Sequence, residues 1–189
     1  MVSAERVYAM LGNETLWLAA KACHELLTVA HIPYAIADDV AVCLHGYQRN
    51  TVDLDLLVQS GRSEAVRHTF ESAGMVWNEH DHEFRTPAGV AIHFLVSGER
   101  AGKDSDVRLP DPADPKIVTE LEGLSVLTLA ALIESKIASG QANLRRTHKD
   151  FADVVELIAR HNLGRDFARY LHKSVRAAFR QLVLHGRAE

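Results

Sequence analysis

The sequence has few of the features that mark secreted or membrane-spanning proteins. It contains two cysteines among 189 residues, Cys23 and Cys43, and both lie in apolar segments. We therefore expect two reduced core thiols in a cytoplasmic protein rather than a disulfide framework. The N-terminus lacks a basic segment followed by an apolar run, and no apolar stretch approaches the roughly 18 residues that a bilayer requires. These absences predict no secretion signal and no membrane partner.

The sequence also lacks an excess of basic residues. Lysine and arginine total 21 against 25 aspartates and glutamates, so the formal net charge is −4. This balance argues against a protein that coats nucleic acid by bulk charge, although it leaves room for a local basic groove. The hydrophobic content of 47% is enough for a substantial core in a chain of this length. We expect one compact unit.

The periodicity of apolar residues predicts alternating helices and strands. Apolar positions at helical spacing and turn residues between short apolar runs predict helices over 13–30, 40–45, 64–73, 128–139, 144–160 and 165–184. Strands are predicted over 32–37, 52–58, 75–79, 82–86 and 89–96, with a further extended piece over 117–121. Residues 97–116, rich in proline, glycine and charge, are predicted to form an exposed loop.

This order predicts an α/β fold, with a mixed sheet of about five strands backed by helices. We expect an α/β core over residues 1–110 and a helical C-terminal part over 111–189, packed together as a single unit. Within the core, Asp53 and Asp55 are two residues apart on a predicted strand and so point to the same face. Paired carboxylates on one face are suited to a hard cation such as Mg²⁺.

The residues around these aspartates resemble a known signature. His45-Gly46, Arg49-Asn50-Thr51 and Asp53-Leu54-Asp55 stand at the spacing typical of the polymerase-beta-type nucleotidyltransferase superfamily. The resemblance is to its small bacterial members related to abortive-infection (AbiEii-like) toxins. It implies a nucleotidyltransferase-like fold and transfer of a nucleoside monophosphate from an NTP to a hydroxyl acceptor. Asp53 and Asp55 would be catalytic and would bind Mg²⁺ in a two-metal site. A tRNA or protein acceptor and a cognate antitoxin are the partners that it suggests.

Two departures from the family pattern leave alternatives open. The third carboxylate of the family is replaced by His93 in Ile92-His93-Phe94-Leu95, which suits a general base or a softer metal better than Mg²⁺. Glu83 or Glu99 could replace the missing carboxylate. The glycine turn that would cradle the phosphates is replaced by Asp38-Asp39, whose charges would repel a triphosphate. Those two aspartates are interpreted either as helix-capping residues or as an added metal ligand.

Further residues match the phosphate-binding positions of the family. Arg49 and Thr51 precede the aspartate strand, while Lys136 and Lys149, with Arg145, lie in the segments 123–136 and 145–153 that resemble the family's helical region. The alternative is that these basic side chains bind no phosphate. They would then form a solvated face and pair with Glu134, Asp150 and Asp153. His80 and His82 form either a metal site or a solvated turn, and the turn is preferred. His45 is expected to orient the short helix or the Asp53 loop.

Three hypotheses for function therefore stand. The first is a Mg²⁺-dependent nucleotidyltransferase, impaired to some degree by the loss of the glycine turn and of the third carboxylate. The second is a catalytically inactive descendant that binds a nucleotide or acts as a toxin–antitoxin-type interaction protein. The third and weakest is a metal-dependent phosphohydrolase that uses Asp53, Asp55 and His93.

Overall fold

The protein, in a computed structural model that describes residues 3–186, is built on one mixed sheet. Its seven strands run in the order β3-β4-β5-β2-β1-β7-β6. They are β1 (Tyr34–Ala37), β2 (Asp53–Val58), β3 (Val76–Asn78), β4 (Glu83–Arg85), β5 (Ala91–Val96), β6 (Val118–Leu121) and β7 (Leu124–Leu127). The predicted α/β class with a mixed sheet is confirmed, with seven strands in place of about five.

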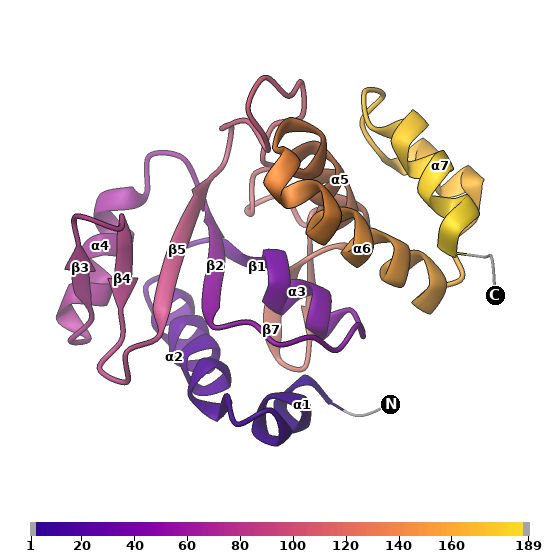
Figure 1. The fold of residues 1–189 in the computed structure, drawn as a ribbon. Coiled ribbons are helices and arrows are strands. Elements are labelled where there is room, and N and C mark those ends of the chain that lie inside the picture. Colours follow the sequence, from indigo (N-terminus) through magenta and orange to yellow (C-terminus); the bar gives the residue numbers. More distant parts are fainter. Residues whose placement is uncertain (1–2, 187–189) are drawn as a thin grey trace.

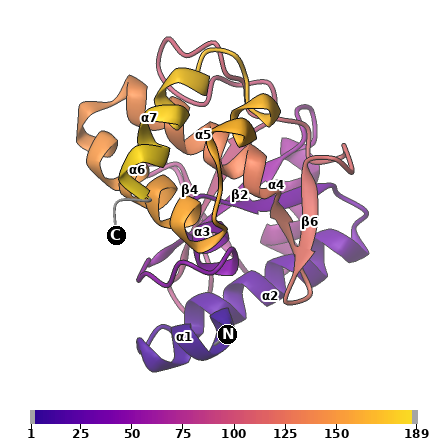
Figure 2. The ribbon, with the colours of Figure 1, turned by 90° about the vertical axis from the view of Figure 1, so that its right-hand side faces the viewer.

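Helices cover both faces of this sheet (Figures 1 and 2). They are α1 (Ala4–Met10), α2 (Glu14–Val29), α3 (Asp38–Leu44), α4 (Ser63–Ser72), α5 (Leu129–Ala142), α6 (Leu144–Arg160), the 3₁₀ helix η1 (Arg165–Tyr170) and α7 (Arg176–Gly186). Helices α2 and α4 pack together, and α5 and α6 form an antiparallel pair with α7 against α6. Within residues 3–186, no helix combines the length and apolar character needed to cross a membrane.

Strand β2 is central to the fold because it pairs antiparallel with β1 and parallel with β5. In this register Asp55 lies opposite both Ala37 of β1 and His93 of β5. Residues paired across a sheet point to the same face, so His93 joins the face of Asp55. Asp38 follows Ala37 directly and begins α3 at the same end of the sheet.

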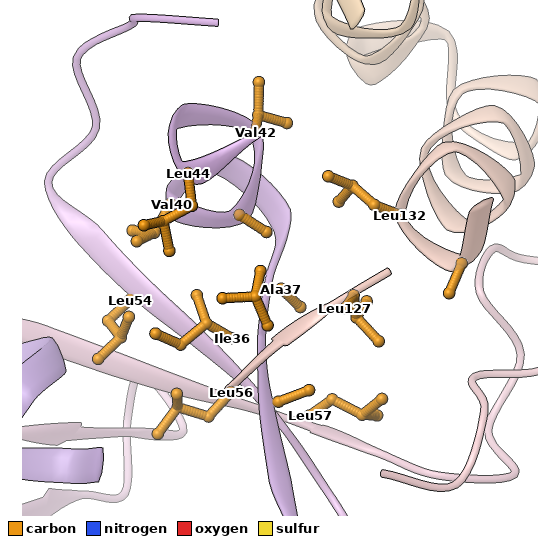
Figure 3. Packing of buried hydrophobic residues seen from close by; sticks show 14 of the residues in the cluster. Ile36, Ala37, Val40, Val42, Leu44, Leu54, Leu56, Leu57, Leu127 and Leu132 are labelled. Atoms are coloured by element: carbon orange, nitrogen blue, oxygen red, sulfur yellow. The ribbon is translucent and has the colours of Figure 1, made fainter. Parts of the chain in front are cut away.

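The opposite face of β2 is a hydrophobic layer. Leu54 and Leu56 are fully buried, and Leu56 pairs with Phe94, whose ring lies 5.5 Å from that of Phe70 in α4. Because side chains alternate along a strand, burial of these residues toward α4 turns Asp53 and Asp55 to the other face. Figure 3 shows how buried side chains of β1, β2 and α3 meet Leu127 of β7 and Leu132 of α5 in one continuous core.

Several local predictions differ from the structure. Helix α3 begins at Asp38 rather than at about residue 40, so Asp38 and Asp39 form its first turn. The predicted helix over 165–184 is two elements, η1 and α7, separated by an extended residue at Leu171. Phe167, Leu171 and Phe179 are spaced as in one helix because each contributes to the same apolar cluster. Helix α1 was not predicted.

Residues beyond the expected division at 110 also contribute to the sheet. Strand β6 was anticipated as an extended piece, but β7 was not, because its four residues directly precede α5 and resemble an entry into that helix. Strand β7 pairs in parallel with β1. This pairing places the start of α5 beside the start of α3.

The segment 97–116 is mostly exposed and contains no helix or strand, as predicted, but part of it packs against the molecule. Val107 and Leu109 are buried, and Gly102 lies so close to α5 that an added Cβ would be 2.6 Å from the carbonyl oxygen of Ala138. Backbone hydrogen bonds join Gly98 to Leu109 and Ala101 to Val107. The segment therefore forms a fixed wall next to the end of β2.

Candidate functional site

Asp53, Asp55 and His93 are brought together on one face of the sheet. His93 Nδ1 lies 3.7 Å from Asp53 Oδ2 and 3.7 Å from Asp55 Oδ1. One ligand atom from each of the three residues lies within 4.8 Å of the others. Asp53 is oriented by the hydroxyl of Thr51, which donates a hydrogen bond of 2.6 Å to Oδ1 and leaves Oδ2 toward His93. Two carboxylates and an imidazole form a donor set that fits a divalent cation.

His93 is held from its other side by Glu83 of β4. Its Nε2 lies 2.9 Å from Glu83 Oε2, and Glu83 itself is buried and paired with Arg85. The Asp55 carboxylate, supported by Glu83 and Asp53 and opposed by burial, raises the pKa of His93 to about 9. These carboxylates therefore favour the imidazolium form of the ring when no metal is present. A positive charge among three carboxylates offsets part of their mutual repulsion.

Asp55 is the more buried of the two strand aspartates. Its side chain is 14% exposed, whereas that of Asp53 is 37% exposed. Burial raises the pKa of Asp55, and the nearby charges of Asp38 and Asp53 act in the same direction while His93 opposes them. A carboxylate in this position gains most when a further positive charge is added beside it.

A second group of charges joins α3 to the C-terminal helices, and we call it the α3–α6 charge cluster. It comprises four carboxylates and four cations, namely Asp38, Asp39, Asp150 and Asp153 with Arg49, Lys136, Arg146 and Lys149. The two halves come from separate parts of the chain. Folding of α5 and α6 onto α3 is what assembles them.

Lys136 is at the centre of this cluster. Its ammonium donates to Asp39 Oδ1 at 2.9 Å and to Asp153 Oδ2 at 2.7 Å, lies 3.4 Å from Asp150, and also contacts Asp38. The residue is 3% exposed. Burial favours the neutral amine, but the attraction of the surrounding carboxylates is larger and raises the pKa of Lys136. The surrounding carboxylates therefore favour the charged form of Lys136 despite its burial.

Asp39 also pairs only with cations of this cluster among the residues described. It is buried, its Oδ2 accepts from Lys149 at 2.7 Å, and Arg49 lies 3.2 Å from its Oδ1. Burial acts to raise the pKa of Asp39, but Lys136, Lys149 and Arg49 together hold it well below its usual range. Asp39 lies in the first turn of α3, where an acidic residue is favoured, but it is not the N-cap, because that position is Ala37 and no side chain caps the helix.

Asp38 differs from Asp39 in its backbone and in its exposure. Its φ is +45°, in the left-handed region that glycine adopts most readily. Its side chain is 16% exposed, accepts from Arg146 at 2.5 Å and contacts Lys136. The backbone shape that a glycine turn would supply is thus present, while the carboxylate covers two cations that could otherwise meet a phosphate.

A cavity of about 110 Å³ lies between the two groups of charges. Asp38 and Asp55 border it on the sheet side, Lys136 and Arg146 on the helix side, and Arg100 of segment 97–116 at its wall. A larger apolar groove of about 900 Å³ lies between α2 and α4, and none of the predicted site residues lines it. The smaller cavity is therefore the one that site residues border, through Asp38, Asp55 and Lys136.

The other predicted residues occupy distinct places. Arg49 binds Asp153 through two hydrogen bonds of 2.7 and 2.8 Å, while Lys149 is 42% exposed over Asp39. Their predicted contacts with phosphate remain predictions. Arg145 is exposed, and its neighbour Arg146 faces Asp38 instead. One residue in a helix corresponds to a rotation of about 100°, which the sequence motif alone could not resolve.

Other candidates lie outside the site. Glu99 is exposed, so of the two suggested substitute carboxylates Glu83 is the one beside His93. His80 and His82 are exposed in the turn between β3 and β4. His45 is buried, and its Nε2 lies 2.8 Å from the carbonyl oxygen of Leu127. It therefore ties the end of α3 to β7, close to the orienting role that was expected.

Comparison with solved structures identifies the fold. ANT(2")-Ia, in complex with adenylyl-2"-tobramycin, matches with a TM-score of 0.54 and 16% identity over 84% of this chain and 93% of that chain. A putative nucleotidyltransferase from H. pylori matches with a TM-score of 0.52 and 16% identity over 93% of this chain and 80% of that one.

An antigenic nucleotidyltransferase-like protein from Paracoccidioides brasiliensis matches with a TM-score of 0.51 and 18% identity, over 76% of this chain and 75% of that one. No family model and no curated protein matches the sequence. At these identities the likeness concerns the fold, which is that of nucleotidyltransferases.

Replacement of the central lysine tests the importance of the charge cluster. Lys136→Met keeps the side-chain length but leaves its buried carboxylates without their shared cation, so we expect a loss of about 3–5 kcal/mol in the free energy of unfolding. The control Lys149→Met removes a partly exposed cation and should lose less than about 1 kcal/mol. Urea unfolding followed by circular dichroism measures both. Equal losses would contradict the central role of Lys136.

The lowered pKa of Asp39 predicts a dependence of stability on pH. A carboxyl group whose pKa is lower in the folded state contributes stability above its unfolded pKa, about 3.9, and loses it as the pH falls toward the folded value. Asp39→Asn lacks this contribution. We expect the stability gap between wild type and Asp39→Asn to narrow below about pH 4 in urea titrations. A gap that stays constant with pH for Asp39→Asn would refute the assignment.

Proposed function

We propose that this protein is a nucleotidyltransferase that transfers a nucleoside monophosphate from an NTP to a hydroxyl acceptor. The observation that supports this most strongly is the convergence of Asp53, Asp55 and His93 on adjacent strands β2 and β5, with Asp55 also lining the cavity at the start of α3. The nucleotidyltransferase fold of the chain agrees with that use of the site. For the acceptor we propose a tRNA or protein hydroxyl, and for the setting a cytoplasmic toxin–antitoxin pair.

Each part of the site has a separate task in this proposal. Asp53 and Asp55 would hold a divalent cation, which supplies charge to activate the attacking hydroxyl and to stabilise the leaving pyrophosphate. Lys136 and Arg146 border the same cavity and would bind phosphate oxygens. Thr51 keeps the Asp53 carboxylate turned toward the cation position. Arg49 and Lys149 pair with Asp39 and offset its negative charge. The Asp39 carboxylate would therefore repel a bound triphosphate only weakly.

A second function is favoured by the contacts of Asp38. Its carboxylate pairs with Lys136 and Arg146, the cations that border the cavity. A protein in which those cations are permanently engaged would bind triphosphate weakly. It would then act as a catalytically inactive nucleotidyltransferase-like partner in a protein complex, such as a toxin–antitoxin pair. The two experiments below separate these functions.

The transferase function predicts a metal-dependent activity that requires Asp55. We would incubate the protein with each labelled NTP, Mg²⁺ or Mn²⁺, and separate pools of tRNA, protein and tobramycin as acceptors. Asp55→Asn should reduce label transfer by at least about a hundredfold, because a bound metal contributes several kcal/mol to such a transition state. The control Asp81→Asn, in the exposed turn between β3 and β4, should retain transfer. Transfer that is unaffected by Asp55→Asn would exclude this site.

The contacts of Asp38 predict that a single substitution raises nucleotide affinity. Asp38→Gly removes a carboxylate next to the proposed phosphate position, ends its contacts with Lys136 and Arg146, and suits the φ of +45°. We expect binding of Mg-NTP or Mn-NTP to tighten at least about tenfold in calorimetry. Asp104→Gly is the matched control, because Asp104 is exposed with a φ of +61°. Unchanged affinity in Asp38→Gly would favour the inactive partner.

A further inference from the structure

The three side chains around the cation position are aligned by partners behind them. Asp53 has one oxygen bound to Thr51 at 2.6 Å, which leaves the other oxygen toward His93. His93 has Nε2 at 2.9 Å from the buried Glu83, which leaves Nδ1 toward Asp53 and Asp55. In both residues the atom with a firm partner is the one that faces away from the shared point. The outward oxygens of Asp53 and Asp55 therefore converge with His93 Nδ1, which offers a lone pair to a cation once that nitrogen is deprotonated.

The distances among the converging atoms leave room for an ion. His93 Nδ1 is 3.7 Å from the nearest oxygen of each aspartate, which is beyond hydrogen-bond range. A hydrogen-bonded carboxylate behind the ring, as Glu83 is here, is typical of histidines that bind metals. In such sites the outer carboxylate fixes the tautomer and makes the inner nitrogen a better donor.

The donor set also discriminates between metals. Mg²⁺ prefers oxygen ligands throughout, whereas imidazole suits first-row transition metals and carboxylates suit several of these as well. We propose that His93 binds a divalent transition-metal ion through Nδ1 together with Asp53 and Asp55, and that this site prefers such an ion to Mg²⁺. Glu83 is then a positioning residue. The inference deepens the proposed function, since it concerns the metal at the same site.

The test uses metal binding by the whole protein without nucleotide. Chelator-treated protein is titrated with Mn²⁺ and followed by electron paramagnetic resonance, and pulsed measurements detect coupling of the bound Mn²⁺ to ¹⁴N. We expect Mn²⁺ to bind at least about tenfold more tightly than Mg²⁺ in competition, with a ¹⁴N coupling. Mn²⁺ that binds without this coupling, or no more tightly than Mg²⁺, would overturn the proposal.

Two variants and a control test whether His93 supplies the nitrogen ligand and whether Glu83 positions it. His93→Asp should lose the ¹⁴N coupling and bind Mg²⁺ better than wild type, because it restores an all-oxygen set. Glu83→Gln should keep the coupling but weaken Mn²⁺ binding about 10- to 100-fold. His80→Asp, in the exposed turn between β3 and β4, is the control and should change neither. A ¹⁴N coupling that persists in folded His93→Asp would contradict the assignment to His93.

These outcomes separate the metal from the reaction. Nitrogen-coupled Mn²⁺ without label transfer to any acceptor would support the metal assignment and contradict the transferase function. Label transfer with Mg²⁺ by a protein that shows no nitrogen coupling would support the transferase and overturn the metal assignment.

Discussion

The site depends on one buried ion pair system around Lys136. The ammonium of Lys136 is 3% exposed and is shared by carboxylates from α3 and α6. A buried charge is tolerated only when it is well paired and hydrogen-bonded, so α5 and α6 cannot shift relative to α3 without a large penalty. Because α3 starts where β1 ends, beside Asp55, this constraint also fixes the helical half of the site against the sheet.

The double aspartate at the start of α3 is explained by this constraint. Two carboxylates in place of a glycine turn would repel each other and any nearby phosphate, yet each has cationic partners from α5 and α6. Asp39 is the buried structural member, and Asp38 is the partly exposed member with the glycine-like backbone. The same pair of residues thus contains one group buried among the charges of the cluster and one group that borders the cavity.

The part of the site that the sequence predicts well is the part that depends on local periodicity. Asp53 and Asp55 share a face because strand side chains alternate, and that follows from two positions in one short strand. The pairing of Asp55 with His93 needed the register of two strands nearly forty residues apart, which only the resemblance suggested. Strand β7 was missed because its four residues run directly into α5.

The part of the site that α5 and α6 contribute was harder to predict. Which of its side chains face α3 depends on the rotation of each helix about its axis. Arg145 and Arg146 are adjacent in sequence, but only Arg146 of the two faces Asp38, while Arg145 is exposed. Likewise, apolar residues spaced by four favoured one helix over 165–184, although η1 and α7 both place such residues against the same cluster. Packing, rather than local pattern, decided both features.

The two groups of charges differ in one respect that bears on the metal. In the α3–α6 charge cluster the four carboxylates are matched by four cations, so its charge is balanced within the folded chain. In the strand group, Asp53, Asp55 and Glu83 face His93, with Arg85 behind Glu83. Even with an imidazolium at His93, that group keeps an excess negative charge. A dication bound to a neutral imidazole would balance it, and this imbalance is the electrostatic reason for a cation to settle on the strands rather than among the helices.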